Sequence, residues 1–400
     1  MKIEIQNIGI IHKANIEMPG LTVLAGHNSV GKSFIFRSIF TSIHSAKLLY
    51  DQSLISVHDE LLRYIKKPKI LDDSEAGKNR ILSDTFSLMR TNDENSALKI
   101  IHQIVDQFSS QTQEDISEHK KNLFEYFSQI QLLLKETYSS FISGLLSEQR
   151  INQNDSNPSF IQFKRNEHTL FQSQIVKDYL QEIPFFKHEF SDYDCTLIEH
   201  PYIFYKELLQ TAHLPLRNLL TKITTKENEK SPTNTLIQEL ILEILKISGI
   251  EASFDTKADD FVFSKNNELL TTTPPSTSSG IKSLALMQML LKYYIQFQHE
   301  NEILLIEEPE AGLHPELQIK YAEIICKMVN TTDIRIVVSS HSPYLIQAFE
   351  FYSKKYLKDK IKFYLGNLTE SGSIFEDVSN EINKIFKLLA KPLNDLIWTR

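Results

Sequence analysis

GHNSVGKS at residues 26–33 has the spacing of a phosphate-binding loop between a strand and a helix. Gly26 and Gly31 leave room for the backbone to surround a phosphate chain, whose oxygens would meet amides entering the following helix. Lys32 would reach the β and γ phosphates, and Ser33 would hold Mg²⁺. The other loop residues that we expect to bind the nucleotide are Asn28, Ser29 and Val30. Alone, this pattern is also compatible with a turn that caps a helix.

A second motif, ILLIEEPEAGLHP at residues 303–315, supports the first. Its four apolar residues at 303–306 predict a buried strand that delivers Glu307 and Glu308 to the same phosphates. One carboxylate would serve the metal and the other the attacking water. Two carboxylates after an apolar strand are also compatible with a solvated strand end. Together, and in this order, the two motifs predict an ATPase.

Size and composition set limits on the class of protein. A chain of 400 residues with 41% hydrophobic content can bury a large core, as one domain with an insertion or as two domains. The net charge of −8 gives no global electrostatic case for a nucleic-acid coat or a membrane-surface protein. Cys195 and Cys326 are far apart and in no metal-binding spacing, as expected in a reducing compartment. No signal peptide or membrane span is apparent, so we expect a cytoplasmic protein without a membrane partner.

The pattern of apolar residues predicts an α/β fold, with a core at residues 1–50 and 250–400 and a mostly helical insertion at 51–249. Strands and hairpins are expected at 2–25 and short strands at 251–270. A buried parallel strand is expected at 334–343, ending near His341. The expected helices are 33–49, 97–108, 122–146, 235–247, 281–297, one that opens at Pro315, and 377–398. Such a sheet binds its ligand at the carboxyl ends of its strands.

These motifs resemble the ABC-type ATPase superfamily that includes SMC and DNA-repair ATPases, and more closely its OLD and abortive-infection-like branch. The resemblance covers roughly residues 1–50 and 250–350 and leaves out the insertion. EEPEAGLHP is its most specific part, because it resembles the E-E-P-E-x-x-L-H-P form of that branch. The resemblance therefore implies an ABC-type P-loop ATPase core, with a mixed, mainly parallel sheet and flanking helices.

The resemblance also implies roles for individual residues. Glu307 would be the metal-side acid and Glu308 the catalytic base, while His341 would be the switch histidine that contacts the γ phosphate. Ala311 to His314 would form the loop that faces a second nucleotide across a dimer. Ser29 stands where many relatives have glycine, which is harmless only if φ stays negative at that position.

The signature segment, TSSGI at residues 277–281, is the weakest match, since transporters have L-S-G-G-Q there. Its role would be to place Ser278 and Gly280, at the start of a helix, against the γ phosphate bound by a second subunit. A serine-rich helix cap after a Pro-Pro turn is the alternative. For the glutamine loop that usually senses Mg²⁺, Gln52 is the nearest candidate, and an ordinary surface glutamine is the alternative.

Such a site implies a homodimer that encloses two ATP molecules. Three functions are compatible with such an ATPase. The preferred one, by resemblance to OLD, abortive-infection and Septu-type ATPases, is an ATP-driven sensor or switch in prokaryotic antiviral defence or a toxin-like system. The second is an SMC- or repair-like ATPase that binds DNA, and the third is a transporter's motor subunit, which the E-E-P-E motif disfavours.

The expected partner is an effector, such as a nuclease or toxin, on a separate polypeptide. Only about 60 residues follow His341, too few for the Toprim nuclease of OLD proteins. DNA or RNA binding stays open. Five lysines could touch phosphates or simply form a solvated helix face: Lys354, Lys355, Lys358, Lys360 and Lys362. The broad apolar face of the C-terminal helix could dock a partner or pack on its own domain.

Overall fold

The computed structural model describes most of the two regions that carry the motifs. The described residues are 1–47, 159–176, 179–180, 185–199, 214–224, 235–255, 260–265, 268–269, 278–297 and 301–398. The chain divides into two compact units. The first comprises Met1–Ile3, Ile10–Phe40 and Asp194–Arg400, and the second comprises Glu4–Gly9 and Thr41–Tyr193. Both sequence motifs belong to the first unit.

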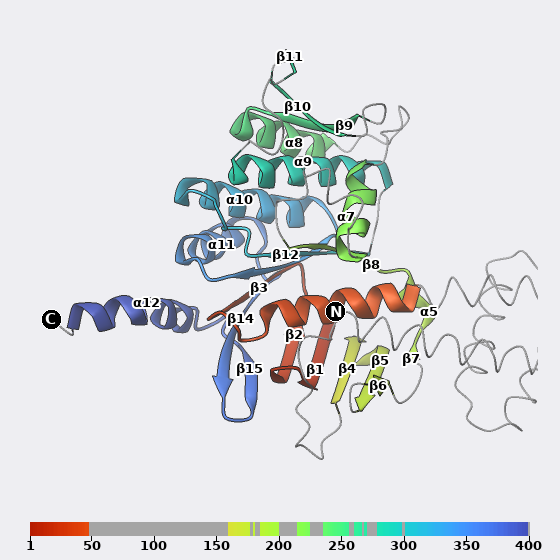
Figure 1. The fold of residues 1–400 in the computed structure, drawn as a ribbon, viewed down its shortest axis with the longest axis vertical. Coiled ribbons are helices and arrows are strands. Elements are labelled where there is room, and N and C mark those ends of the chain that lie inside the picture. The colour runs from red at the N-terminus through yellow and green to blue at the C-terminus, as the bar shows by residue number, and fades with distance from the viewer. Residues whose placement is uncertain are drawn as a thin grey trace, which may run out of the picture. The chain divides into compact units, whose positions relative to one another are not determined.

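The first unit contains a mixed, mainly parallel sheet, as predicted (Figure 1). Its strands lie in the order β2 (Ile11–Glu17), β15 (Gly372–Asp377), β14 (Ile361–Thr369), β3 (Leu21–Gly26), β13 (Arg335–Ser340), β12 (Glu302–Glu307) and β8 (Asp194–Ile198). Only the β14–β15 pair is antiparallel among the neighbours in this series. The central strands are buried along their length, which explains their continuous runs of branched apolar residues.

The strand register brings the two sequence motifs to one edge of this sheet. Ser340 at the end of β13 pairs with Ala25 of β3, and Ser339 pairs with Glu307 at the end of β12. The phosphate-binding loop, the glutamates and the His341 segment therefore leave three adjacent parallel strands at their carboxyl ends. This is the edge at which open α/β sheets bind ligands.

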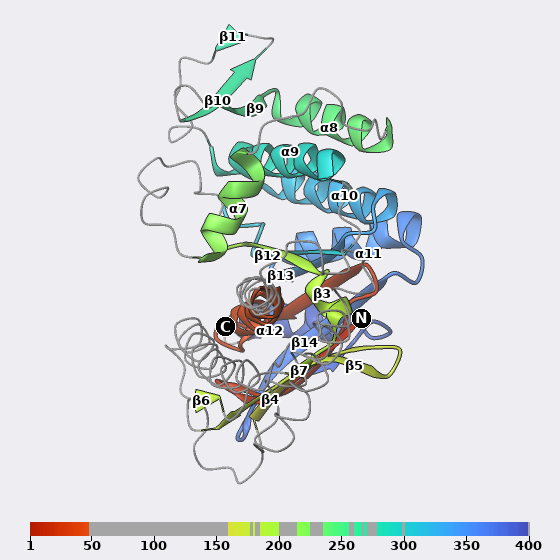
Figure 2. The same ribbon diagram turned by 90° about the vertical axis from the view of Figure 1, so that its right-hand side faces the viewer.

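Helices cover both faces of this sheet. The helices of the unit are α7 (Leu214–Thr224), α8 (Thr235–Ser248), α9 (Ser279–Phe297), α10 (Pro315–Thr331), α11 (Pro343–Tyr356) and α12 (Asn383–Trp398). Figures 1 and 2 both show α10 between α9 and the strands, while the helix that begins at residue 32 lies on the other face of β3. A small antiparallel sheet of β9 (Glu251–Asp255), β10 (Asp260–Lys265) and β11 (Glu268–Leu269) follows α8 in the chain.

Two helices begin directly after the edge that carries the motifs, and local sequence explains both starts. His314 caps α10 by accepting a hydrogen bond from the Glu316 amide, and Pro315 occupies the first turn. Ser342 caps α11 in the same way through the Leu345 amide, and Pro343 follows it. Both helices thus start a few residues after a strand end, which keeps the intervening loops short.

The second unit contains antiparallel strands. They are β4 (Ser159–Arg165), β5 (His168–Val176), β6 (Tyr179–Leu180) and β7 (Phe185–Phe186), and the short helix α5 (His188–Ser191) follows them in the chain. Most of β1 (Lys2–Ile8) also belongs to this unit. Phe163, Phe171 and Phe190 are fully buried, and their rings lie 5.0 to 6.0 Å apart. These aromatic contacts form part of the core of the described residues of this unit.

Several predicted elements differ from the observed ones. Residues 159–198, assigned to a mostly helical insertion, include strands β4 to β8, and β8 extends the sheet of the first unit. The C-terminal helix begins at Asn383 rather than at 377, because Asp377 is the last residue of β15 in the β14–β15 hairpin and a turn follows it. The helices predicted at 97–108 and 122–146 lie outside the described residues. The helices at 235–247 and 281–297 are observed as α8 and α9.

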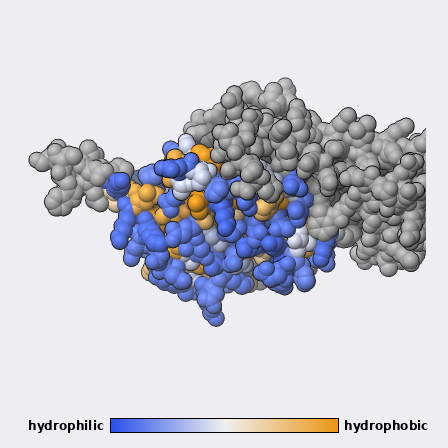
Figure 3. Space-filling model, turned by 90° about the horizontal axis from the view of Figure 1, so that it is seen from below, coloured by the Kyte–Doolittle hydropathy of each residue, from blue (hydrophilic) through white to orange (hydrophobic). Residues whose placement is uncertain are grey.

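Apolar side chains on the described surface are mostly scattered. The large exposed ones are Leu236, Leu242, Ile319, Tyr344, Phe351 and Leu368. The face seen in Figure 3 is mainly hydrophilic with small hydrophobic areas. Among the described helices, none has the length and apolar character needed to span a bilayer. Isolated exposed apolar residues are normal and indicate no particular partner.

A buried ion cluster joins α7 to the two strands at one side of the sheet. The Lys222 ammonium, only 3% exposed, donates to Glu302 Oε1 at 2.7 Å and lies 3.2 Å from Asp194 Oδ2. It also donates to Thr196 Oγ1. Burial raises the pKa of the Glu302 carboxyl, and Lys222 opposes this shift. The lysine therefore compensates a carboxylate that has no access to water.

We expect Lys222→Met to lower the free energy of unfolding by about 3 kcal/mol, because it leaves the Glu302 carboxylate buried without its counterion. Urea unfolding followed by circular dichroism measures this change. Lys320→Met, at an exposed position of α10, is the matched control and should change the free energy by less than about 0.5 kcal/mol. Equal effects of the two substitutions would show that the buried ion cluster makes no specific contribution to the free energy of unfolding.

Candidate active site

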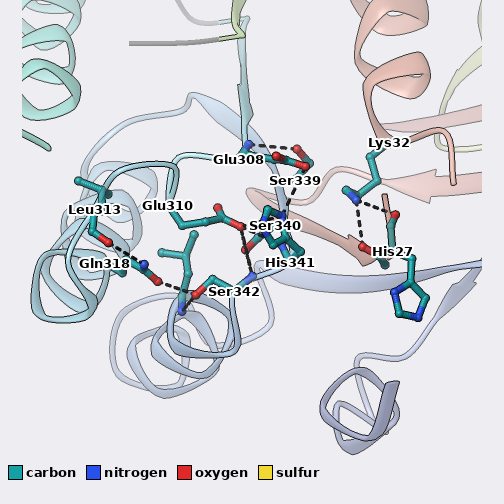
Figure 4. Close-up of polar contacts among 12 residues, drawn as sticks. His27, Lys32, Glu308, Glu310, Leu313, Gln318, Ser339, Ser340, His341 and Ser342 are labelled. Atoms are coloured by element: carbon teal, nitrogen blue, oxygen red, sulfur yellow. Dashed lines mark hydrogen bonds and ion pairs between the residues drawn. The ribbon is translucent and has the colours of Figure 1, made fainter. Parts of the chain in front are cut away.

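The loop after β3 adopts a shape that depends on its glycines. Gly26 and Gly31 have φ angles of 146° and 93°, which side chains rarely allow. A Cβ at Gly26 would come within 2.9 Å of the Gly366 carbonyl oxygen, and one at Gly31 within 3.0 Å of Ile10 and Ile11 side-chain atoms. The Lys32 ammonium donates to the carbonyl oxygens of Gly26 and His27 at 2.9 and 3.0 Å (Figure 4). The loop is thus closed around its own lysine.

Lys32 lies in an acidic environment. Its side chain is buried, and burial lowers the pKa of its ammonium, while the carboxylates of Glu308, Glu310 and Glu307 raise it. Glu308 has the largest of these three effects. The structure therefore brings Lys32 and the glutamates of the second motif into the same electrostatic environment. An anionic ligand bound here would complement the Lys32 ammonium, and a cation would complement the glutamate carboxylates.

Ser33 and Glu307 face each other across the two motifs. The Ser33 hydroxyl donates to Glu307 Oε2 at 3.1 Å, and Oε1 of Glu307 is buried without a hydrogen-bond partner in the described structure. Burial raises the pKa of the Glu307 carboxyl to about 7, and the Ser33 hydrogen bond opposes this shift. A hydroxyl and a carboxylate with a free oxygen are hard oxygen donors of the kind that Mg²⁺ prefers. These two residues therefore fit a magnesium ion.

Glu308 is held in a strained conformation. Its φ of 42° is unusual for a residue with a side chain, and its amide donates to the Ser339 carbonyl oxygen at 3.1 Å. Its carboxylate is partly exposed, and Oε1 lies 3.5 Å from Nδ1 of His341. Strain of this kind is common at functional sites. The backbone thus directs Glu308 away from the core and towards the imidazole.

Glu310 is a site residue for which no role was predicted from the sequence. Its carboxylate is buried, and Oε1 accepts hydrogen bonds from Ser340 Oγ at 2.8 Å, the His341 amide at 2.8 Å and the Ser342 amide at 3.2 Å. The same oxygen lies 3.5 Å from His341 Nδ1 (Figure 4). Glu310 therefore fixes the backbone that carries His341. Only its place in the E-E-P-E motif could have drawn attention to it.

The predicted signature segment lies at the amino end of α9. Ser278 is exposed and its carbonyl oxygen accepts the Lys282 amide, while a Cβ at Gly280 would meet Leu313 Cδ2 at 3.0 Å. The Ser279 hydroxyl donates to the Gly312 carbonyl oxygen at 2.9 Å. The signature segment thus packs against the loop at 311–314 of its own chain. Thr277 lies outside the described residues.

The condition under which serine would be harmless at position 29 is not met, because Ser29 has a φ of 67°. This left-handed conformation costs a residue with a side chain about 1 kcal/mol. Asn28 and Ser29 are exposed, whereas Val30 is buried and its Cγ2 lies close to Gly26 and Gly366. Gln52 lies outside the described residues.

Glu199 is a second residue that the sequence did not indicate. It follows β8, whose Ile198 pairs with Ile306, so it stands beside Glu307 at the same edge of the sheet. Its carboxylate lies 3.7 Å from Arg37 and raises the pKa of Glu307. No sequence motif contains Glu199. It could be placed at this edge only if β8, the strand before it, had been predicted. The acidic edge is therefore wider than the two motifs suggested.

The lysine group near the C-terminus is not one helical face. Lys354 and Lys355 belong to α11, Lys358 has a φ of 51° in the following turn, and Lys362 lies on β14. Lys354 pairs with Glu350 at 2.8 Å. Lys362 likewise pairs with Asp377 at 2.7 Å. Part of the group's charge is thus neutralised within the chain.

A comparison with protein families assigns this site to a class. A family model described as AAA ATPase domain matches residues 1–346, which is most of the chain. The chain belongs to the AAA ATPase domain family. Its fold is the predicted α/β fold, with a mixed, mainly parallel sheet and flanking helices. A comparison with curated proteins found no match.

Solved structures similar to this AAA ATPase domain include an SMC head bound to the C-terminal winged-helix domain of ScpA, with 12% identity, coverage of 96% of this chain and 98% of the other, and a TM-score of 0.44. The SMC head domain from Thermotoga maritima has 10% identity, coverage of 94% and 98%, and a TM-score of 0.41. The ADP form of MJ1267, an ATP-binding cassette of an ABC transporter, has 10% identity, coverage of 100% and 99%, and a TM-score of 0.37.

Proposed function

We propose that this AAA ATPase domain binds MgATP at the carboxyl ends of β3, β13 and β12 and hydrolyses it. The observation that carries the proposal is the convergence of Lys32, Glu307 and Glu308 at one edge of the sheet, with Lys32 in the field of both glutamates. Lys32 binds the β and γ phosphates, with the loop residues 26–33 around them. Titration calorimetry with MgATP tests binding directly, and no heat of binding would contradict the proposal.

Each remaining residue has a place in the proposed reaction. Ser33 and Glu307 hold the magnesium ion, which neutralises charge on the phosphates when bound. Glu308 orients the attacking water and accepts its proton, and its exposed carboxylate suits this role. Nε2–H of His341 donates a hydrogen bond to the γ phosphate, while its Nδ1 lies 3.5 Å from a carboxylate oxygen of both Glu308 and Glu310.

The proposed hydrolysis uses two protomers. The exposed Ser278 and the amino end of α9 bind the γ phosphate held by the other protomer, with the loop at 311–314 beside them. Their mutual packing within one chain supports this, because it lets both segments reach a second subunit together. The same surface in both subunits forms a closed dimer.

We expect magnesium and a slowly hydrolysed ATP analogue to convert the monomer into a dimer, because each nucleotide joins two protomers. Light scattering after size-exclusion chromatography measures the mass. Ser278→Arg should prevent the dimer, whereas Ser253→Arg, at an exposed position of β9, should not. A dimer that forms equally well without nucleotide, or with Ser278→Arg, would contradict this arrangement.

We further propose that the ATPase is the sensor or switch of a prokaryotic antiviral defence or toxin-like system and acts with an effector on another polypeptide. The EEPEAGLHP motif supports this, by its resemblance to the OLD and abortive-infection-like branch. Affinity purification with the ATP analogue or with ADP tests it. A nuclease or toxin recovered only with the analogue supports the proposal. Steeply salt-dependent DNA binding with no protein partner would favour an SMC- or repair-like ATPase instead.

A further inference from the structure

Gln318 of α10 connects two segments of the site that lie on different elements. The Ser342 hydroxyl donates to its Oε1 at 2.5 Å, and its Nε2 donates to the Leu313 carbonyl oxygen at 2.9 Å (Figure 4). The Gln318 side chain is only 8% exposed. A buried amide uses its acceptor at one end and its donor at the other, which few other side chains can do. Gln318 therefore links the His341 segment to the loop at 311–314.

At one end of this link, Ser342 is held tightly. Its amide donates to Ser340 Oγ at 3.0 Å and to Glu310 Oε1 at 3.2 Å, and its hydroxyl caps α11. Glu310 Oε1 also accepts the His341 amide. A displacement of His341 is therefore transmitted to Ser342, because the three consecutive residues at 340–342 share one carboxylate oxygen.

At the other end, the link continues to the amino end of α9. Leu313 follows Gly312, whose carbonyl oxygen accepts the Ser279 hydroxyl at 2.9 Å and whose φ is 75°. A Cβ at Gly312 would meet Ser279 Oγ, so the two segments are in close contact. Ser342 is thus connected to Ser279 by hydrogen bonds through Gln318 to Leu313, by the peptide bond between Leu313 and Gly312, and by the hydrogen bond from Ser279 to Gly312.

We infer that Gln318 is a positioning residue that couples the His341 segment of one ATP site to the surface that completes the second site. The inference rests on the proposed function, in which His341 contacts the γ phosphate and the α9 end faces the partner protomer. When the γ phosphate holds His341, the link holds residues 311–314 and Ser279 in the conformation that binds the partner. Loss of the phosphate releases both ends.

Gln318→Leu tests this inference, because it keeps the size of the side chain and removes both hydrogen bonds. We expect ATP-dependent dimerisation to weaken about tenfold, while MgATP binding to the monomer stays within about twofold of the parent. Gln318→Glu should have a similar effect, since it keeps the acceptor for Ser342 and loses the donor to Leu313. Gln347→Leu, at an exposed position of α11, is the matched control.

A double-mutant cycle separates coupling from a general loss of stability. Ser279→Ala removes the last hydrogen bond of the link, and we expect it to weaken dimerisation about as much as Gln318→Leu does. The double variant should be no weaker than either single variant, because both interrupt one pathway. Independent structural damage would instead give additive effects and a loss of monomer binding.

The outcomes distinguish this inference from the proposed function. If the parent protein neither binds MgATP nor dimerises, the proposed function fails. If the parent does both, and Gln318→Leu dimerises as the parent does, the coupling role of Gln318 is overturned. Additive effects with Ser279→Ala would overturn it as well.

Discussion

Glu308→Gln is expected to bind MgATP with an affinity close to that of the parent and to lose about 1000-fold in kcat. The amide keeps the shape of the carboxylate but cannot accept a proton from the attacking water. The Glu308 side chain is 40% exposed, against 5% for Glu310, so removal of its charge disturbs the packed part of the site little. Phosphate release and titration calorimetry measure the two quantities separately.

The matched control is Glu316→Gln, in the first turn of α10 and exposed. It should leave kcat within about twofold of the parent, since the side chain lies outside the proposed site. Phosphate release by Glu308→Gln at the rate of the control would remove Glu308 from the role of catalytic base. If Glu308→Gln loses MgATP binding and keeps turnover, the role of Glu308 is to bind the nucleotide.

Lys32→Ala is expected to weaken both MgATP binding and ATP hydrolysis. The dissociation constant for MgATP should rise about tenfold or more, and kcat/KM should fall by about 100-fold or more. The lysine ammonium is the buried cation of the loop, and its removal leaves the phosphates facing the glutamates without compensation. The two loop carbonyl oxygens that it binds lose their donor as well.

Lys13→Ala, at an exposed position of β2, is the control for the removal of one positive charge. Thermal unfolding of both variants shows whether the Lys32 substitution acts through the fold. A Lys32→Ala protein that binds and hydrolyses ATP like Lys13→Ala would mean that residues 26–33 are only a turn that caps a helix.

The sequence predicted the strands that precede the motifs because each is a short, fully buried run of branched residues followed directly by polar residues. Leu304 and Val337 are examples, and both are fully buried. The helix at 235–247 was predictable for a similar reason, since its apolar residues recur with helical spacing. Local patterns of this kind need no information from the rest of the chain.

The parts that the sequence did not predict depend on distant partners. Strand β8 contains Asp194 and Thr196, whose burial is compensated by Lys222 and Glu302 from other elements. In the β14–β15 hairpin, β14 has a run of four buried residues and β15 has only two, and neither pattern predicts the pairing between the two strands. The hydrogen bond between Gln318 and Ser342 joins residues 24 positions apart on different elements, and no spacing rule reveals it.

The most direct test of the central claim is a crystal structure of Glu308→Gln grown with MgATP. We expect one triphosphate whose β and γ oxygens contact the Lys32 ammonium, with a magnesium ion bound by Ser33 and Glu307 on the same phosphates. A nucleotide bound elsewhere, or a triphosphate that contacts Lys32 while Glu307 and position 308 face away from it, would contradict the account.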